Sequence, residues 1–257
     1  ALGMVEEVEA HMQRAIRKVS IEEGADPRAA VLVAFGGAGG LHATALARRL
    51  DMAGVVIPPH CGVFSAVGLL LSPPRADAAR SIPPADDPAV IETALRILRS
   101  AVAADLGRMA GTEGDVVSSV DVRYAGQSHE ITVPFTPGDG STALRRRFED
   151  AHRTRNGFFL PDAPIEAVTV RAAATGTPAL RWEQTATAPD GDEARRGVRT
   201  VIVAGAAADA AIWWRPSLTP GTEIVGPAVV AESEATTWIG PGERAVAGPG
   251  GELAVTW

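Results

Sequence analysis

The chain has 257 residues, of which 46% are hydrophobic and 21% charged, and its formal net charge is -7. This length and composition suit a globular protein of one large or two ordinary domains and exclude a disordered or fibrous chain. The negative charge argues against an extended phosphate-binding surface, so no nucleic-acid partner is expected. The single cysteine, Cys61, cannot form an internal disulfide, so we expect a cytoplasmic protein.

The first quarter of the chain predicts a helix followed by a βαβ unit. Apolar residues recur at helical spacing over residues 5–19, and Gly24 ends that helix. Residues 31–35 are a continuous apolar run, typical of a strand buried on both faces. A helix is predicted over 41–50 and a second buried strand over 55–57. Because strand, helix and strand follow one another closely, we expect a parallel sheet.

The most apolar stretch, residues 55–71, is interrupted by Pro58, Pro59 and Gly62. It therefore falls short of the ~20 continuous apolar residues that a membrane helix needs, and no membrane span is expected. Residues 72–88 are dense in Pro, Asp and Ala and lack apolar periodicity. They predict a domain boundary or a long connection.

The remaining two thirds of the chain is expected to be rich in strands. The apolar period changes from helical to alternating after a helix predicted over 89–109. A second, polar helix is predicted over 142–156. Strands are expected at residues 116–124, 129–133, 165–174, 200–204, 224–231, 236–239 and 253–257.

A glycine-rich loop, GGAGG at residues 36–40, joins the first predicted strand to the helix after it. It gathers backbone N–H groups and a helix N-terminus at one point, which can bind phosphate or pack against a nucleotide. No Gly-Lys-Ser/Thr follows, as a Walker A loop requires, and His42 stands where a dinucleotide fingerprint has its third glycine. A tight turn in which glycine only permits close packing is the alternative.

Other candidate groups have simpler interpretations. His60 and Cys61 are adjacent, but neighbours in a strand or turn usually point apart, which favours a buried structural thiol over a nucleophile. Ser65 lacks the preceding glycine of a nucleophile elbow and is expected to cap a short helix. Glu232 and Glu234 alternate along a predicted strand, where they could present two carboxylates on one face or protect a sheet edge. The histidines are scattered, so no metal site is predicted, and the catalytic residues stay unknown.

Several segments, taken in one order, carry a resemblance to a known family. They are LVAFGGAGGLHATALARRL, VVIPPHCGVFSAVGLLLS, DVRYAGQSHEITVPF, FEDAHRTRNGFFLPDAPIEAVTVRAAATG and LTPGTEIVGPAVVAESEATTWIGPGE. Together they resemble the C-terminal portion of the ATP-dependent hydantoinase A and 5-oxoprolinase family, which includes the ATP-using subunits of acetone-type carboxylases. The resemblance covers nearly the whole chain.

The resemblance implies an α+β chain. A partial actin-like (ribonuclease H-like) βαβ segment, residues 1–75, would be the C-terminal end of the ATPase domain. Residues 76–257 would be the strand-rich, mixed α+β hydantoinase A C-terminal domain. In that fold a glycine turn packs against the adenosine, with a helix behind it. By position, the resemblance places these features at Gly36, Gly37, Ala38, Gly39 and, more weakly, His42.

The family activates an amide or carbonyl oxygen by ATP-dependent phosphorylation, so ATP and Mg²⁺ are implied for the full-length parent. The resemblance further implies a small cyclic amide substrate, as in N-methylhydantoinase or 5-oxoprolinase, and a hydantoinase B-like partner subunit. No Asp-x-Gly-Gly-Thr phosphate loop occurs, and Gly40 stands where the family usually has proline. The chain by itself is therefore expected to be inactive and to bind no nucleotide tightly.

Two alternatives stay open, and either is compatible with a homo-oligomer. The parent could be the ATP-using subunit of an acetone carboxylase-type enzyme. The chain could instead be a non-catalytic docking domain, in which Tyr124, Gln127 and the strands after them form a face for a partner subunit. A complete sugar kinase is disfavoured, because the chain is too short for two actin-like lobes and lacks both phosphate loops.

Overall fold

The computed structural model describes residues 2–185 and 189–257, which form two compact units. The first unit combines the segment that ends at Leu71 with the segment that starts at Leu180, and the second unit is Ser72–Ala179. The sequence predicts one division near residue 75 but not the return of the chain at Leu180. Among the described helices, none is both long and apolar enough to span a bilayer.

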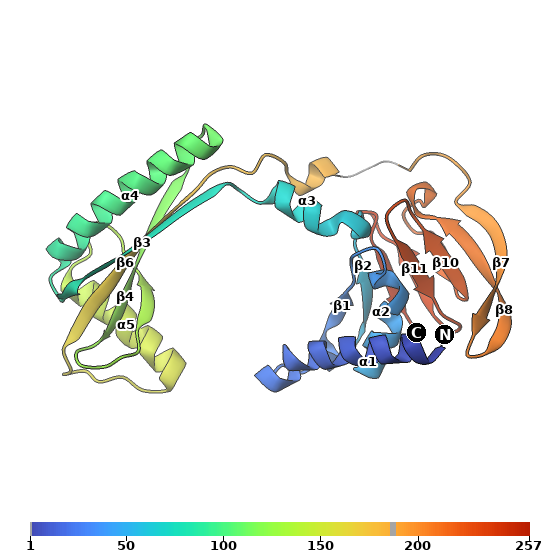
Figure 1. The fold of residues 1–257 in the computed structure, drawn as a ribbon, viewed down its shortest axis with the longest axis horizontal. Coiled ribbons are helices and arrows are strands. Elements are labelled where there is room, and N and C mark those ends of the chain that lie inside the picture. Colours follow the sequence, from blue (N-terminus) through green and yellow to red (C-terminus); the bar gives the residue numbers. More distant parts are fainter. Residues whose placement is uncertain (1, 186–188) are drawn as a thin grey trace. The chain divides into compact units, whose positions relative to one another are not determined.

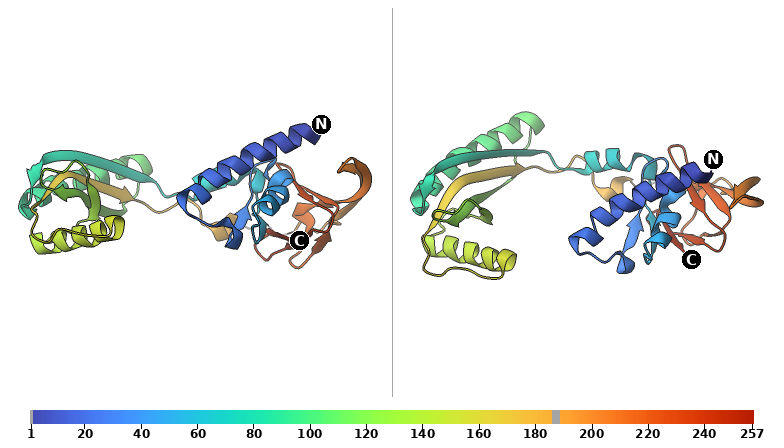
Figure 2. Two further views of the ribbon diagram at one scale, coloured as in Figure 1. Left: turned by 90° about the horizontal axis from the view of Figure 1, so that it is seen from below. Right: turned by 60° about the horizontal axis from the view of Figure 1, so that its bottom comes forward.

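The first unit begins with the helix and the βαβ unit that the sequence predicts. The helices are α1 (Leu2–Lys18), α2 (Gly39–Arg49) and α3 (Phe64–Leu71), and the strands between them are β1 (Val31–Val33) and β2 (Gly54–Ile57). Strands β1 and β2 are parallel, with Leu32 opposite Val55. The predicted parallel pairing is therefore confirmed. Figure 2 shows α1, in dark blue, lying across one side of this unit.

The C-terminal segment adds strands to this sheet and forms a second one. The five-stranded sheet has the order β1-β2-β13-β12-β9, with β9 (Glu223–Val225), β12 (Arg244–Ala247) and β13 (Leu253–Thr256). The four-stranded sheet has the order β11-β10-β8-β7, with β7 (Arg195–Val203), β8 (Ala206–Trp214), β10 (Ala228–Ala231) and β11 (Thr236–Ile239). The βαβ segment is therefore continuous with the C-terminal strands through the antiparallel pairing of β2 with β13.

The C-terminal strands differ from the prediction in two ways. The single strand expected over 224–231 is two strands, β9 and β10, because Gly226 and Pro227 separate them and proline cannot donate to a ladder. Strands β8 and β12 were not predicted from the pattern. Alanine-rich segments such as AAADAA in β8 give a weak strand signal, since alanine is depleted in strands.

The second unit is one antiparallel sheet with two helices. The sheet has the order β3-β6-β4-β5, with β3 (Arg75–Ala85), β4 (Asp115–Tyr124), β5 (Ile131–Pro134) and β6 (Ile165–Thr175). Helix α4 (Pro88–Ala110) runs along β3 and β6, and α5 (Ser141–Asn156) packs beside β5 (Figure 1). The inward side of α4 buries Ile91, Leu95, Leu98, Val102 and Leu106.

Strand β3 corrects the prediction of a structureless connection over residues 72–88. It pairs along its length with β6, with Asp77 opposite Ala173. Its charged residues and prolines resemble a linker in sequence, yet they are tolerated because β3 is an edge strand with one free side. The boundary of the second unit at Ser72 falls just before this strand.

Candidate functional site

The glycine-rich loop lies between β1 and α2, and neighbouring loops fix its backbone. The Gly36 N–H donates to the carbonyl oxygen of Cys61 at 2.7 Å, and the Gly37 carbonyl accepts from the Thr236 N–H at 3.2 Å. Gly36 has a φ of 90°, in the left-handed region that glycine adopts most readily. The Gly39 N–H closes the turn by donating to the Gly36 carbonyl at 3.1 Å.

Two further loops pack against this turn, backbone to backbone. A Cβ atom added to Gly37 would lie 3.1 Å from the carbonyl oxygen of Glu234, in the turn between β10 and β11. A Cβ atom on Gly62, in the loop after β2, would overlap the same carbonyl. On α2, a Cβ atom on Gly40 would lie 2.6 Å from the Thr237 hydroxyl oxygen. These close contacts with neighbouring loops therefore require glycine, as expected if the loop is a tight turn in which glycine permits close packing.

The outer side of the same turn is open. Gly37 and Ala38 are exposed, and among the described residues their N–H groups donate to no acceptor. Ala38 is the residue before α2 and offers no side-chain cap. The first N–H groups of a helix lack partners within it and lie at the positive end of its dipole, so they favour an anionic or carbonyl-like ligand. The turn is thus packed on one side and offers free donors on the other.

The structure places His42 on α2, where its hydrogen bond is with α1. Its Nδ1 atom lies 3.3 Å from Glu9 Oε1, and the other oxygen of Glu9 lies 2.8 Å from Arg49 Nη2. Glu9 is buried. A buried carboxylate is costly unless it is paired, so this trio serves to join α1 to α2. None of these contacts places His42 on the open side of the glycine turn.

Behind the turn lies a buried network centred on Arg215, which follows β8 and is 8% exposed. Its Nη1 atom donates to Glu232 Oε1 at 3.0 Å and to the Cys61 sulfur at 3.5 Å. Its Nη2 atom donates to the carbonyl oxygens of Ile57, Pro58 and Gly251 at 2.7–3.0 Å. One guanidinium therefore joins the end of β2, the loop after it and the turn after β10. No local spacing in the sequence indicates this residue.

Cys61 belongs to this network and not to a catalytic pair. Its thiol donates to Glu232 Oε1 at 2.9 Å, and burial, with that hydrogen bond, raises the pKa of Cys61 to about 12. The sulfur therefore stays protonated at neutral pH and is a poor nucleophile. His60 has a different partner, since its Nε2 atom lies 2.8 Å from the Thr185 carbonyl oxygen. The prediction of a buried structural thiol is confirmed.

The prediction that Glu232 and Glu234 lie along a strand is wrong. Glu232 and Glu234 both follow the end of β10, in the turn to β11. Glu232 points into the Arg215 network, whereas Glu234 is exposed and contributes its backbone carbonyl to the packing of the glycine turn. Because a turn does not alternate as a strand does, the two side chains have separate environments.

Two family models match the chain. The model described as hydantoinase/oxoprolinase matches residues 1–78, and the model described as hydantoinase/oxoprolinase C-terminal domain matches residues 89–247. This chain belongs to the hydantoinase/oxoprolinase family. The resemblance inferred from the sequence motifs is therefore confirmed for its C-terminal portion.

Relatives of this hydantoinase/oxoprolinase chain are much longer than it is. It is 36% identical to an uncharacterized protein of Methanocaldococcus jannaschii, over 94% of this chain and 35% of that protein. It is 32% identical to caprolactamase subunit alpha of Pseudomonas jessenii, over 67% of this chain and 27% of the subunit. It is 28% identical to 5-oxoprolinase 1 of Arabidopsis thaliana, over 96% of this chain and 20% of that protein. The chain thus spans about a third or less of these relatives.

Two solved structures share the fold. A nucleotide-free acetone carboxylase matches with a TM-score of 0.84 and 17% identity, over 99% of this chain and 39% of that chain. An ATP-dependent caprolactamase from Pseudomonas jessenii matches with a TM-score of 0.63 and 26% identity, with the same coverage. The expected α+β fold class is confirmed by these matches and by the several mixed sheets of the structure.

The second unit of this hydantoinase/oxoprolinase chain does not present the docking face in the form that the sequence suggests. Tyr124 is 2% exposed, its hydroxyl accepts a hydrogen bond from the Leu160 N–H at 2.7 Å, and its ring packs against Phe148. Of Tyr124 and Gln127, the two residues predicted for this face, only Gln127 is exposed. Tyr124 therefore belongs to the core, and its place in a docking face is excluded.

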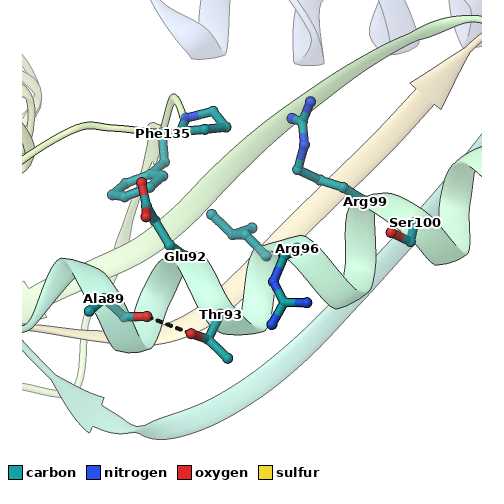
Figure 3. A pocket seen from close by; sticks show the side chains of 9 residues that line it. Ala89, Glu92, Thr93, Arg96, Arg99, Ser100 and Phe135 are labelled. Carbon is teal, nitrogen blue, oxygen red and sulfur yellow. Dashed lines mark hydrogen bonds between the residues drawn. The ribbon is translucent and has the colours of Figure 1, made fainter.

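A pocket of about 430 Å³ lies in the second unit, between the first turns of α4 and the segment after β5 (Figure 3). Leu95 and Phe135 form its apolar part. Most of its polar groups are engaged by the fold: Arg99 donates to the Val116 carbonyl and to Ser118 Oγ at 3.0 Å, and Glu92 accepts from the Gly138 N–H. None of the predicted site residues lines it. Among the described residues, no group of three or more His, Cys, Asp or Glu side chains is arranged to hold a metal ion.

Proposed function

We propose that this chain is the C-terminal part of an ATP-dependent cyclic-amide hydrolase, and that its glycine turn contributes part of the adenosine site. The observation that carries the proposal is the turn at Gly36, Gly37, Ala38 and Gly39, in which Gly37 and Ala38 are exposed and their N–H groups have no acceptor among the described residues. Support comes from relatives named 5-oxoprolinase and from a structure described as an ATP-dependent caprolactamase.

The turn fits a nucleotide for two physical reasons. Backbone without side chains allows the nucleoside to approach closely, and the N–H groups of Gly37 and Ala38 can donate to its oxygen or nitrogen acceptors. The loops behind the turn keep these donors in place before the ligand arrives, which lowers the entropic cost of binding. His42 would act indirectly, by holding α2 against α1 through Glu9.

ATP would activate the amide oxygen by phosphorylation, which converts a stable amide into an electrophile with a leaving group. This chain would bind and orient the nucleoside end of ATP. No described cluster fits Mg²⁺, so the residues for the metal and the phosphates would lie in the rest of the parent protein. For the same reason the chain alone would be inactive and would bind nucleotide weakly.

The parent would act with a hydantoinase B-like subunit in the cytoplasm, on a small lactam or hydantoin. A separate subunit is consistent with the name of the caprolactamase relative, which is a subunit alpha. Part of the second unit would then contact that partner. Copurification of the two subunits from cells that express both genes would test this part of the proposal, and separate elution of the two would contradict it.

Calorimetry with ADP on the full-length protein tests the adenosine site. Gly37→Val should abolish detectable binding, because the side chain would press on Glu234 and occupy the open side of the turn. Gly107→Val is the matched control, since Gly107 is exposed on α4 with no atom within 4 Å of an added Cβ. If Gly37→Val lowers the melting temperature but keeps its ADP affinity, the turn is only a packing device and the docking-domain alternative is favoured.

The acetone carboxylase-type alternative is supported by the fold match with a TM-score of 0.84. The same purified holoenzyme distinguishes the two reactions. ATP hydrolysis that depends on a lactam or hydantoin supports the hydrolase, whereas ATP hydrolysis that requires both a ketone and bicarbonate supports the carboxylase.

A further inference from the structure

We propose that the second unit holds a binding site for a small zwitterion, an amino acid that carries one ammonium and one carboxylate group. The site is a pocket of about 480 Å³, called here the His152 pocket, and a small-molecule site typically has such a size. Its lining residues include Gln127, Glu130, His152, Arg155, Asn156 and Phe158. The glycine turn belongs to the first unit, so this site is separate from the proposed adenosine site.

Two segments that are distant in the sequence meet at the His152 pocket. One is the turn after β4, where the Gln127 N–H donates to the Tyr124 carbonyl oxygen at 3.0 Å. The other is the last turn of α5, which ends at Gly157. The ring centres of Tyr124 and His152 lie 5.1 Å apart and join the two segments. Both segments carry part of the family resemblance, yet the proposed adenosine site uses neither of them.

His152 presents one ring nitrogen to the pocket. Its side chain is 7% exposed, and its ring centre lies 5.1–5.7 Å from those of Tyr124, Phe148 and Phe158. Its Nδ1 atom lies 2.7 Å from the Phe158 carbonyl oxygen, which can only accept, so Nδ1 carries the hydrogen and Nε2 of the neutral ring is an acceptor. Within the described chain Nε2 has no partner and no buried side-chain nitrogen or oxygen is left unpaired, so Nε2 is accessible from the pocket.

Two opposite charges in the pocket also lack partners. Arg155 and Glu130 are exposed, and neither makes a hydrogen bond or an ion pair with another residue that the structure describes. Glu130 adds a longer-range attraction to Arg171, but the ion pair of Arg171 is with Asp121 at 2.7 Å. One cation and one anion in a single pocket are complementary to a ligand that carries both charges.

A small amino acid pairs with all of these groups at once. Its carboxylate would accept hydrogen bonds from the Arg155 guanidinium and from the side-chain amides of Gln127 and Asn156. Its ammonium group would donate to the Glu130 carboxylate and to Nε2 of His152. A ligand with only one charge would leave either Arg155 or Glu130 without a partner, so the pocket favours a zwitterion.

The carbon chain of the ligand also has a contact surface, and its chemistry agrees with the proposed reaction. Phe158 is 55% exposed and offers an apolar ring beside the polar groups. Hydrolysis of a lactam breaks the amide C–N bond and adds water, which leaves a carboxylate and an ammonium group on one molecule. The pocket would therefore bind the product class of that reaction. This last link rests on the proposed function, whereas the binding of a zwitterion does not.

Calorimetry on the full-length protein with probes of one carbon-chain length tests the site. L-norleucine and 6-aminohexanoate carry both charges, hexanoate carries only the carboxylate, and hexylamine carries only the ammonium group. At least one of the two amino acids should bind about tenfold more tightly than hexanoate and hexylamine, because it pairs with both charges of the pocket. Equal affinity for a probe with a single charge, or no binding of any probe, would overturn the proposal.

Matched variants test whether the amino acid binds in the His152 pocket. Arg155→Gln and Glu130→Gln should each weaken its binding about tenfold, since each removes one charge partner of the ligand. Both side chains are exposed and unpaired, so the melting temperature should stay nearly the same. Arg146→Gln is the control, because Arg146 is also exposed on α5 but does not line the pocket. Equal weakening by Arg146→Gln would overturn the assignment to this pocket.

A titration in the presence of saturating ADP separates this site from the proposed adenosine site. The amino acid should bind equally well with and without ADP, because the glycine turn and the His152 pocket belong to different units. Displacement of the amino acid by ADP would place it at the glycine turn and overturn the proposal. If ADP does not bind at all but the amino acid and the variants behave as expected, only the adenosine site is contradicted.

Discussion

The guanidinium of Arg215, which is buried behind the glycine turn, lies 3.0 Å from the partly buried carboxylate of Glu232. The same carboxylate oxygen accepts a hydrogen bond from the Cys61 thiol, and the Cys61 carbonyl oxygen accepts one from the Gly36 N–H. The position of the turn therefore depends on an ion pair that lies behind it.

Replacing Arg215 by Met should destabilise the first unit strongly. The change leaves Glu232 without its counter-charge and three backbone carbonyls without their donor. Removing one partner of a buried pair typically costs about 3–5 kcal/mol. Urea unfolding followed by tryptophan fluorescence measures this specifically, because all five tryptophans of the chain lie in the first unit.

The matched control is Arg244→Met. Arg244 pairs with Glu223 at 2.6 Å, but both side chains are about half exposed, and such surface pairs contribute little. A similar urea midpoint for the two variants would show that the Arg215 network is not structurally important.

The Cys61 thiol should be unreactive in the folded protein. Burial raises its pKa to about 12 from a usual value of 9.0, so almost no thiolate exists at pH 8. An aromatic disulfide reagent at pH 8 should therefore modify Cys61 only after denaturant is added. Rapid modification of the native protein would contradict the buried, hydrogen-bonded arrangement.

The same raised pKa predicts a stability change at alkaline pH. The folded state holds the thiol proton more tightly than the unfolded chain does, so this stabilisation is complete below pH 9 and is lost as the pH rises towards 12. The free energy of unfolding of the natural protein should fall more steeply over this range than that of Cys61→Ser, whose hydroxyl does not titrate there. Parallel pH profiles would exclude a contribution from Cys61.

Local patterns in the sequence predict the parts of the fold that local interactions determine. The helical spacing in α4 predicts its buried residues Ile91 and Leu95, and the apolar runs predict β1 and β2. The sequence pattern does not predict strand β3, because its prolines and charged residues are acceptable in an edge strand but are also typical of a linker. The glycine turn itself is visible in the sequence, because its left-handed backbone requires a particular residue type.

The support of the turn could not be predicted in this way. The acceptors of Arg215 come from residues 57, 58, 61, 232 and 251, which are adjacent only after β2, β10 and β13 assemble. Likewise, Glu9 and His42 are brought together by the packing of α1 on α2. Such contacts have no fixed spacing along the chain, so a single sequence contains no signal for them.

In the second unit, Asp121→Asn should be destabilising and should change the response to acid. Asp121 is 2% exposed; burial favours its neutral form, but hydrogen bonds from Arg171 at 2.7 Å and Thr132 at 2.6 Å outweigh this and lower its pKa. The carboxylate therefore adds stability above pH 4, which is lost as the pH falls through the lowered pKa.

Hydrogen exchange of the β4 amides at several pH values measures the effect of Asp121→Asn. At neutral pH the variant should expose these amides more often, by about 1–3 kcal/mol of opening free energy, since one strong acceptor is lost. As the pH falls through the lowered pKa of Asp121, the two proteins should converge. A constant difference between them at all pH values would exclude titration of Asp121 as the cause.

Gly36→Ala separates backbone strain from ligand binding. Gly36 and Gly138 both have a φ of 90°, and an added Cβ would meet no atom within 4 Å at either position. An alanine held in the left-handed region costs about 1–2 kcal/mol, so both substitutions should lower the stability of their own unit by similar amounts. Only Gly36→Ala should weaken ADP binding to the full-length protein, by tenfold or more, because relief of the strain shifts the N–H groups of Gly37 and Ala38. If the two variants bind ADP equally well, the free donors of this turn do not contact the nucleotide.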